Sequence, residues 1–192
     1  AELPIDSLAR LIEYLKKTPD VGYGSVGPGS SQHLAGAFFE QLIGARMTHV
    51  PYRVTGNLVT DLVAGRVPVS FQLLPNVLGS IQGAKVRPLA VSTKARIPAF
   101  PDIPPVADSV PGYDVAAWFM VVAPSKTPPA VVERLYAELK TILAMPDVRE
   151  QIAKISLLPI ESQSVPAMQE FVKSEIVRWG KVVEAAGVAR SE

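Results

Sequence analysis

The sequence predicts an α/β protein built on a mostly parallel sheet. Apolar segments of strand length alternate with segments of helical periodicity over the first half of the chain, and turn residues separate them. Of the 192 residues, 48% are hydrophobic, which is enough for a buried core. Strands that alternate with helices pair in parallel. We therefore expect a parallel sheet covered by helices.

The elements of the first half follow from their patterns. Leu8, Leu11, Ile12 and Leu15 share one face of a predicted helix over residues 5–17. The further elements that we expect there are strands at 21–25, 47–52, 67–71 and 86–92, and helices at 31–43, 57–64 (capped by Asn57) and 76–82.

The second half has a different character. Prolines crowd residues 97–112, which indicates an ordered linker between two bodies. The apolar run 115–123 suits a buried strand, and residues 157–160 an edge strand. Helices are expected after the cap Thr127, over 146–155 and over 166–186. So few strands cannot satisfy their own backbone edges. We therefore expect the chain to be a fragment, or to complete its sheet with another copy.

The segment from Val21 to Leu34 is the most informative, because a strand runs into a glycine-rich turn that opens a helix. We expect Ser30 to cap this helix and Gly44 to end it, with Leu34, Phe38 and Leu42 on its buried face. Such a turn presents unpaired backbone N–H groups and the positive end of the helix dipole. Each N–H bond to a carboxylate contributes roughly 1.5–3 kcal/mol. The turn predicts a binding site for a small anionic solute.

Other classes of function find little support. The chain has 19 basic and 18 acidic residues, so its net charge of +1 gives no indication of binding to nucleic acid. Cysteine is absent, and no apolar stretch reaches the ~20 residues that cross a bilayer. The glycine pattern lacks the acidic residue of a dinucleotide site. His33 at a helix start and His49 in a strand are interpreted as structural residues rather than as a base and a metal ligand. We expect no catalytic residue, no metal and no cofactor.

Many short motifs resemble the Bug family of periplasmic substrate-binding proteins, which serve tripartite tricarboxylate transporters. The resemblance covers essentially the whole chain, in order, and rests on Gly24-Ser-Val-Gly-Pro-Gly-Ser-Ser-Gln-His-Leu34, His49-Val-Pro-Tyr52, Asp61-Leu-Val-Ala-Gly65, Leu89-Ala-Val-Ser92, Pro101-Asp-Ile-Pro104, Trp118, Ala123-Pro124 and Trp179-Gly180. It implies a type II periplasmic-binding-protein fold, the Venus flytrap. In this fold a carboxylate-bearing solute lies between two domains, partly held through ordered water, and passes to a membrane permease.

The resemblance also implies a domain assignment. Family members carry about another hundred N-terminal residues, with a Pro-x-x-Ala-Gly-Gly loop that this chain lacks. Residues 1–92 are then the complete second domain, 93–114 a proline-rich crossover, and 115–192 the C-terminal part of the first domain, a strand plus helices. The chain would hold half a cleft, with any export signal removed or outside the sequence.

The ligand contacts are carried over residue by residue. Those that match the family's glycine-rich loop are Ser25, Gly27, Gly29, Ser30 and Ser31. Tyr52, Thr55 and Gln72 are expected as specificity contacts, although relatives usually read Tyr-Lys-Gly and Phe-Asp at these places. Because an amide replaces a carboxylate at Gln72, we expect ligands without an ammonium group to be favoured.

Two alternatives stay open beside a periplasmic receptor for a small organic acid. The glycine-rich loop could serve an enzyme that uses a phosphorylated ligand, with His33 as its base. The fragment could also act as an interaction module that associates with itself through the unpaired strand. No nucleic-acid partner is expected in either case.

Overall fold

The computed structural model describes residues 5–98, 100–158, 160 and 164–187. The chain divides into two compact units. Unit 1 comprises residues 1–117 and 182–192, and unit 2 comprises residues 118–181.

Unit 1 is built on a three-stranded parallel sheet. Its strands are β1 (Val21–Ser25), β2 (Met47–Pro51) and β3 (Val69–Ser70), in the order β2-β1-β3. β1 is central and pairs in parallel with both neighbours. This confirms the predicted α/β class and the direction of the sheet.

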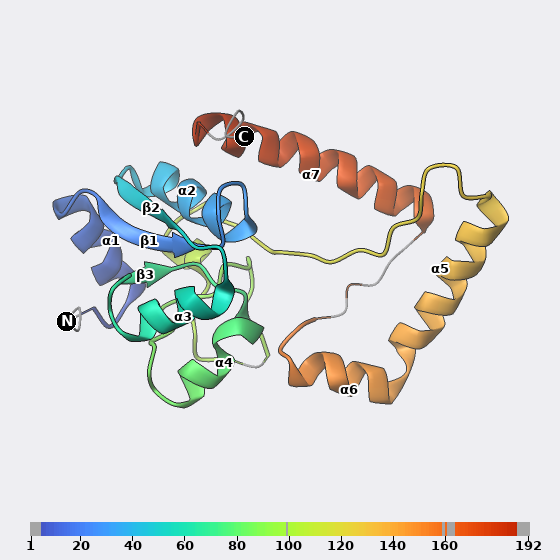
Figure 1. The fold of residues 1–192 in the computed structure, drawn as a ribbon, viewed down its shortest axis with the longest axis horizontal. Coiled ribbons are helices and arrows are strands. Elements are labelled where there is room, and N and C mark those ends of the chain that lie inside the picture. Colours follow the sequence, from blue (N-terminus) through green and yellow to red (C-terminus); the bar gives the residue numbers. More distant parts are fainter. Residues whose placement is uncertain (1–4, 99, 159, 161–163, 188–192) are drawn as a thin grey trace. The chain divides into compact units, whose positions relative to one another are not determined.

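Helices follow each strand, as parallel pairing requires. They are α2 (Ser31–Ile43), α3 (Thr55–Val63) and α4 (Leu74–Gln82), while α1 (Leu8–Lys17) precedes β1. The chain moves from β1 to β2 in one direction and from β2 to β3 in the other, so right-handed crossovers place α2 and α3 on opposite faces of the sheet. Figure 1 shows α2 and α3 on either side of β1.

Two glycines let these helices approach the central strand. The side chain of Tyr23, only 2% exposed, fills the space where a Cβ of Gly36 in α2 would lie. On the other face, Leu58 of α3 fills the space beside Gly24. Tyr23 and Gly24 are adjacent strand residues and so face opposite sides. The core of unit 1 is therefore packed through both faces of β1.

The predicted caps of α2 are confirmed, but its predicted buried face is wrong. Ser30 Oγ accepts a hydrogen bond from the His33 N–H at 3.2 Å, and Gly44 ends the helix at a φ of 66°. The buried residues of α2 are Gln32, His33, Ala35, Gly36, Phe39 and Ile43, instead of Leu34, Phe38 and Leu42. Gly36 turns toward β1 because the ring of Tyr23 occupies the space where its side chain would lie.

Several other boundaries also differ from prediction. The strand expected at 86–92 is reduced to a single bridge between Val91 and Pro105, and the one at 67–71 to Val69–Ser70. α3 begins two residues before Asn57, with Val54 at its N-cap and no side-chain bond. Val91 pairs with Pro105 and not with β3, which itself pairs with β1 at only two positions.

The proline-rich segment packs within unit 1. It contains a short 3-10 helix, η1 (Val106–Asp108), and buries Val106, Val110 and Tyr113. The Tyr113 hydroxyl donates to the carbonyl of Ala35 in α2 at 3.1 Å. The domain boundary expected after Ser92 stays a prediction.

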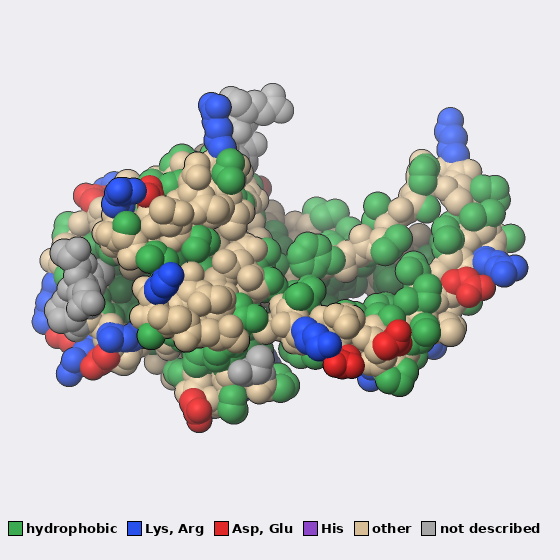
Figure 2. Space-filling view, turned by 60° about the horizontal axis from the view of Figure 1, so that its bottom comes forward, with side chains coloured by type: hydrophobic (Ala, Val, Ile, Leu, Met, Phe, Trp, Pro, Cys, Tyr) green, Lys and Arg blue, Asp and Glu red, His purple; other side chains and the backbone are tan. Residues whose placement is uncertain are grey.

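Unit 2 consists of α5 (Pro129–Ala144), α6 (Pro146–Lys154) and most of α7 (Val165–Ala185). The cap of α5 is Pro128 and not Thr127. Among the described residues of this unit only Glu175 is buried, and its carboxylate accepts bonds from the indole N–H groups of Trp118 (3.2 Å) and Trp179 (3.0 Å). Figure 2 shows hydrophobic side chains at the surface of these helices.

The strand predicted over residues 115–123 is wrong for this chain. Residues 115–123 form no strand, and Phe119, Val121 and Val122 are 76%, 72% and 80% exposed. The described part of unit 2 contains no strand that could pair with this run. The edge strand expected at 157–160 is likewise absent at residues 157, 158 and 160, and residue 159 lies outside the described residues.

No helix in the described part of the chain is long and apolar enough to span a bilayer.

Replacing Gly36 with alanine tests the packing of α2 on β1. We expect Gly36→Ala to lower the free energy of unfolding by about 1–3 kcal/mol, because the new methyl group overlaps the buried ring of Tyr23. Gly79→Ala is the matched control in α4, where no atom lies within 4 Å of the added Cβ. It should stabilise by up to about 1 kcal/mol through helix propensity. Urea denaturation measures both, and equal effects would contradict the packing assigned to Gly36.

Candidate functional site

The candidate site lies at the carboxyl ends of the strands. The connections from β1 and from β2 run in opposite directions, so the chain order reverses at β1. Ligands of open parallel sheets bind at such a switch point, outside the carboxyl ends of the strands. The loop after β1 is the glycine-rich turn, residues 26–30, and the first turns of α2, α3 and α4 begin at the same edge (Figure 1).

Gly27 and Gly29 give this turn its shape. Their φ angles are 117° and 73°, in the region that side chains disfavour. No atom lies within 4 Å of the position that a Cβ would take at either residue. The backbone of the turn is therefore open to close approach from outside.

The expectation that the N–H groups of this turn are unpaired is wrong for four of them. Val26 N–H donates to Gln32 Oε1 at 2.8 Å, and Gly29 N–H donates to His33 Nδ1 at 3.1 Å. Gly27 N–H donates to Ser25 Oγ at 3.1 Å, and Ser30 N–H to the Gly27 carbonyl at 3.3 Å. Pro28 has no N–H. Side chains from α2 thus hold the turn in place.

The unpaired donors lie one step further on, in the first turns of the helices. Within the described residues, the N–H groups of Ser31 and Gln32 have no acceptor, and neither has the Ser31 hydroxyl. The N–H groups of Thr55 and Gly56 at the start of α3 likewise have no acceptor within the described residues. Two helix N-termini at one edge of the sheet therefore offer backbone donors to an anion.

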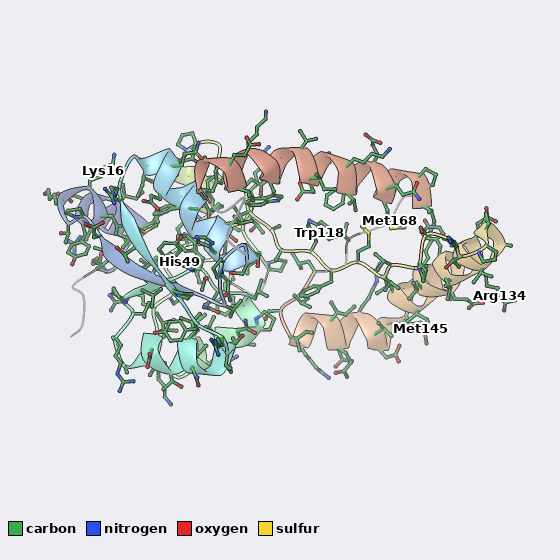
Figure 3. All side chains as sticks on the ribbon, turned by 45° about the horizontal axis from the view of Figure 1, so that its top comes forward. Lys16, His49, Trp118, Arg134, Met145 and Met168 are labelled. Carbon is green, nitrogen blue, oxygen red and sulfur yellow. The ribbon has the colours of Figure 1, made fainter. Side chains whose placement is uncertain are left out.

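Ser25 and the two histidines form a compact polar cluster under the turn. Ser25 is fully buried, and its Oγ lies 2.6 Å from His49 Nε2. The rings of His33 and His49 stack with centroids 3.8 Å apart and planes inclined by 12°. His49 is on β2 (Figure 3), so the cluster connects two strands with α2. Both histidines have structural contacts, in line with their sequence interpretation.

Burial keeps both imidazoles neutral. It lowers the pKa of His33, and burial together with the neighbouring His33 lowers the pKa of His49 to about 4. His33 Nδ1 accepts the Gly29 N–H, so the proton of the neutral ring is on Nε2. Protonation of Nδ1 would replace that bond with a repulsion between two N–H groups.

The predicted specificity residues all follow β2 or β3. The Tyr52 hydroxyl donates to Asp61 Oδ2 at 2.8 Å, and Arg66 pairs with the same carboxylate at 2.6 Å. Thr55 is the first residue of α3 and is half-buried. Gln72 Oε1 accepts from Gln32 Nε2 at 3.0 Å, and Gln72 Nε2 donates to Ser70 Oγ at 2.7 Å. The direct contact of these residues with a ligand stays a prediction.

Sequence reasoning missed three residues at this edge. Gln32 and Ser70 both bond to Gln72, but they give no local signal because Gln32 lies 40 residues from Gln72, and the second partner of Ser70, the Gly24 carbonyl, lies 46 residues away. Arg53, in the loop after β2, is exposed, and no ion-pair partner for it lies in the described part of the chain. A basic residue directly after a strand of a parallel sheet was the signal available for Arg53.

The described residues contain no group of three or more His, Cys, Asp or Glu side chains that could hold a metal ion.

The family model for the tripartite tricarboxylate transporter family receptor, TctC, matches residues 1–188. The chain belongs to this family. Its sequence is 34% identical over 188 residues to a protein of the tcbD-tcbE intergenic region of Pseudomonas sp. strain P51, with 94% of this chain and 56% of that protein covered. It is 31% identical to Protein BugT of Bordetella pertussis, with 97% of this chain and 57% of BugT covered.

Solved structures show the same fold. R. palustris Rpa4515 with adipate superposes with a TM-score of 0.89 at 35% identity, covering 97% of this chain and 63% of that one. MatC of Rhodopseudomonas palustris with bound malate superposes with a TM-score of 0.80 at 28% identity, covering 94% of this chain and 63% of MatC. The periplasmic binding protein BugD superposes with a TM-score of 0.82 at 28% identity, covering 97% of this chain and 64% of BugD. This TctC-family chain therefore has the predicted periplasmic-binding-protein fold, and it spans between half and two thirds of these relatives.

The stacked histidines predict a pH dependence of stability. Their pKa values are lower in the folded chain than the ordinary 6.5, so the unfolded chain binds protons more readily. Stability should fall as the pH drops below about 6.5, and the loss should continue until about 4, where His49 titrates in the folded state. Allowing for solvent screening, we expect the free energy of unfolding to be about 1 kcal/mol smaller at pH 5 than at pH 7.

His49→Gln is the control, because its amide oxygen can accept the Ser25 hydroxyl hydrogen without titrating in this range. Urea denaturation at pH 5 and pH 7 measures the difference for both proteins. A pH dependence that is identical in the wild type and in His49→Gln would show that His49 does not contribute.

Proposed function

We propose that this chain is part of a periplasmic solute-binding protein that captures a small carboxylate-bearing metabolite for a tripartite tricarboxylate transporter. The donors at the ends of β1 and β2 carry the proposal. Backbone N–H groups at Ser31, Gln32, Thr55 and Gly56 have no intramolecular acceptor within the described residues, and they lie at the switch point of the sheet.

The charges around these donors suit an anion. Arg53 is exposed in the loop between β2 and α3, next to the donors at Thr55 and Gly56. The nearest acidic side chain of that loop and helix, Asp61, already accepts bonds from Tyr52 and Arg66. Two relatives of similar fold hold dicarboxylates, adipate in one and malate in the other. Helix N-termini with a nearby cation bind such groups.

The roles of the site residues follow from their positions. Ser31 and Thr55 would donate to ligand carboxylates, and Gly27 and Gly29 would leave the turn open. Ser25 and Ser30 have their hydroxyl groups bonded within the turn, so their part is to hold its shape. Tyr52 would position the loop through its bond to Asp61. Gln72 would favour ligands that carry no ammonium group.

The alternative of an enzyme has less support. Its expected base, His33, uses Nδ1 to accept the Gly29 N–H and is 6% exposed. The Ser25 hydroxyl, which contacts the imidazole ring of His49, is fully buried and cannot reach a substrate. The arrangement favours binding over chemistry.

The wider setting of the protein is proposed from the family. We place residues 1–92 in the second domain of the receptor, residues 93–114 in the crossover and residues 115–192 in the first domain. The receptor would work in the periplasm and deliver its ligand to the membrane subunits of the transporter. Association of two copies through residues 115–123 stays a prediction of the sequence.

Ser31→Pro tests the donor role of the Ser31 N–H. Proline fits the first position of a helix, and the extended backbone of Ser30 (φ −64°, ψ 155°) suits a residue before proline. The variant therefore removes a donor without removing the fold. We expect adipate to bind about tenfold or more weakly by isothermal titration calorimetry, as expected for the loss of a charge-assisted bond.

Ser31→Ala is the matched control, because it removes the hydroxyl and keeps the N–H. The difference between the two variants isolates the backbone donor. Equal adipate affinities in Ser31→Pro and Ser31→Ala would contradict a ligand contact at this N–H.

Gln72→Asp tests the preference for ligands without an ammonium group. The wild type should bind succinate more tightly than aspartate, because the amide of Gln72 carries no negative charge to pair with an ammonium group. The carboxylate of the variant should shift the affinity ratio toward aspartate by about tenfold, the size of a charged hydrogen bond. Gln72→Asn matches the shortening without the charge, so a ratio that shifts equally in both variants would count against the assignment.

A further inference from the structure

Four hydrogen bonds form a closed ring at the carboxyl end of β1. Val26 N–H donates to Gln32 Oε1 (2.8 Å), and Gln32 Nε2 donates to Gln72 Oε1 (3.0 Å). Gln72 Nε2 donates to Ser70 Oγ (2.7 Å), which in turn donates to the Gly24 carbonyl (2.8 Å). The ring runs from Val26, the residue after β1, through α2 and the end of β3 to Gly24 of β1, and the backbone between Gly24 and Val26 closes it.

The two backbone groups determine the direction of every bond in this ring. A backbone N–H can only donate and a backbone carbonyl can only accept. Gln32 must turn its oxygen to Val26, so its nitrogen faces Gln72. Gln72 must then turn its oxygen to Gln32 and its nitrogen to Ser70. Either amide turned over would place two oxygens or two N–H groups against each other.

Gln32 and Gln72 differ in what they can reach. Gln32 is 4% exposed, so its side chain lies beneath the site. Gln72 is half-buried, and its amide keeps one N–H and one oxygen lone pair beyond the bonds of the ring. Gln72 is thus the member of the ring that can contact a ligand, and the buried Gln32 sets the orientation of its amide.

We propose that Gln32 is a positioning residue that fixes which end of the Gln72 amide faces the site, and thereby sets ligand preference without touching the ligand. The orientation follows from the ring alone. Its effect on preference rests on the proposed function, in which the remaining N–H of Gln72 donates to a ligand carboxylate.

Gln32→Glu inverts the ring on this argument. The ionised glutamate keeps an oxygen for Val26 N–H but places its second oxygen, which can only accept, against Gln72. Gln72 must turn over and donate its nitrogen to residue 32, so its oxygen meets Ser70. The Ser70 hydroxyl then donates to Gln72, and the Gly24 carbonyl loses its partner. Ser70→Ala is the matched control, because it shortens the ring at its other end and leaves Gln32 to hold Gln72 as before.

Nuclear magnetic resonance of the ligand-free, ¹⁵N-labelled chain tests the orientation. The side-chain amide signals of Gln72 are assigned by their loss in Gln72→Glu. In the wild type we expect nuclear Overhauser contacts from these amide protons to the β protons of Ser70. In Gln32→Glu these contacts should be lost and contacts to the γ protons of residue 32 gained. Ser70→Ala should keep the wild-type orientation.

A folded Gln32→Glu chain whose Gln72 contacts stay unchanged at a pH where residue 32 is ionised would overturn the proposal, because a protonated carboxyl could donate to Gln72 as the amide does. If that variant does not fold, Gln32→Met decides the question without a buried charge. It should remove the fixed orientation, so that the contacts of Gln72 to Ser70 weaken at least twofold. Unchanged contacts in Gln32→Met would overturn the proposal equally.

Titration with succinate separates the two proposals. We expect Gln32→Met to bind succinate about tenfold more weakly than the wild type, and Ser70→Ala to bind it less than threefold more weakly. A Gln72 amide that loses its orientation while succinate affinity stays at the wild-type value would overturn the role of Gln32 in preference. Absence of succinate, adipate and malate binding in the wild type itself, with the Gln72 contacts as expected, would contradict the proposed function and leave the orientation by Gln32 standing.

Discussion

Parallel pairing of β1 with both of its neighbours constrains the rest of unit 1. A parallel strand cannot return through a tight turn, so a helix follows each strand and the three helices begin at one edge. The unpaired N–H groups of Ser31 and Thr55 belong to different helices and are 24 residues apart in sequence, yet the direction of the sheet brings both to that edge. The candidate site is therefore a product of topology before it is a product of individual side chains.

Intramolecular bonds within the glycine-rich turn change how it can serve a ligand. Gln32 and His33 of α2 hold the N–H groups of Val26 and Gly29. Those groups are not available to a solute without breaking a bond, so they contribute rigidity and not affinity. A turn that is already ordered spares the solute the entropy cost of ordering it. The next donors along the chain, at Ser31 and Gln32, have no acceptor within the described residues and are the ones proposed to bind the solute.

The sequence predicted best those features whose causes are local. The two ends of α2 were predicted correctly at Ser30 and Gly44, because a helix cap depends on two or three neighbouring residues. The strand expected at 115–123 was wrong because a strand also needs a partner, and periodicity carries no information about where the partner is. The buried face of α2 was assigned to Leu34, Phe38 and Leu42, whereas the close approach of the Tyr23 ring at Gly36 turns a different face of the helix toward the sheet.

The candidate site shows the same division. The turn itself was visible as Gly27, Gly29 and Ser30, since positive φ angles and a cap have local signatures. The sequence did not predict that Gln32 and His33 accept the N–H groups of Val26 and Gly29. Nothing in the local pattern of a helix shows which backbone group an amide or imidazole side chain will bond. Gln72 was singled out by comparison with a family pattern, while its partner Gln32 lies 40 residues away and could be found only in three dimensions.

The hydrogen-bonded ring at the end of β1 also bears on how such a site can diverge. Each member passes a donor to the next, so a carboxylate at position 72 would leave Ser70 without a donor and demand a reversed hydroxyl there. A substitution at position 32, 70 or 72 thus alters the hydrogen bonds available to the other two, so a change of preference at one of them is felt by the whole ring.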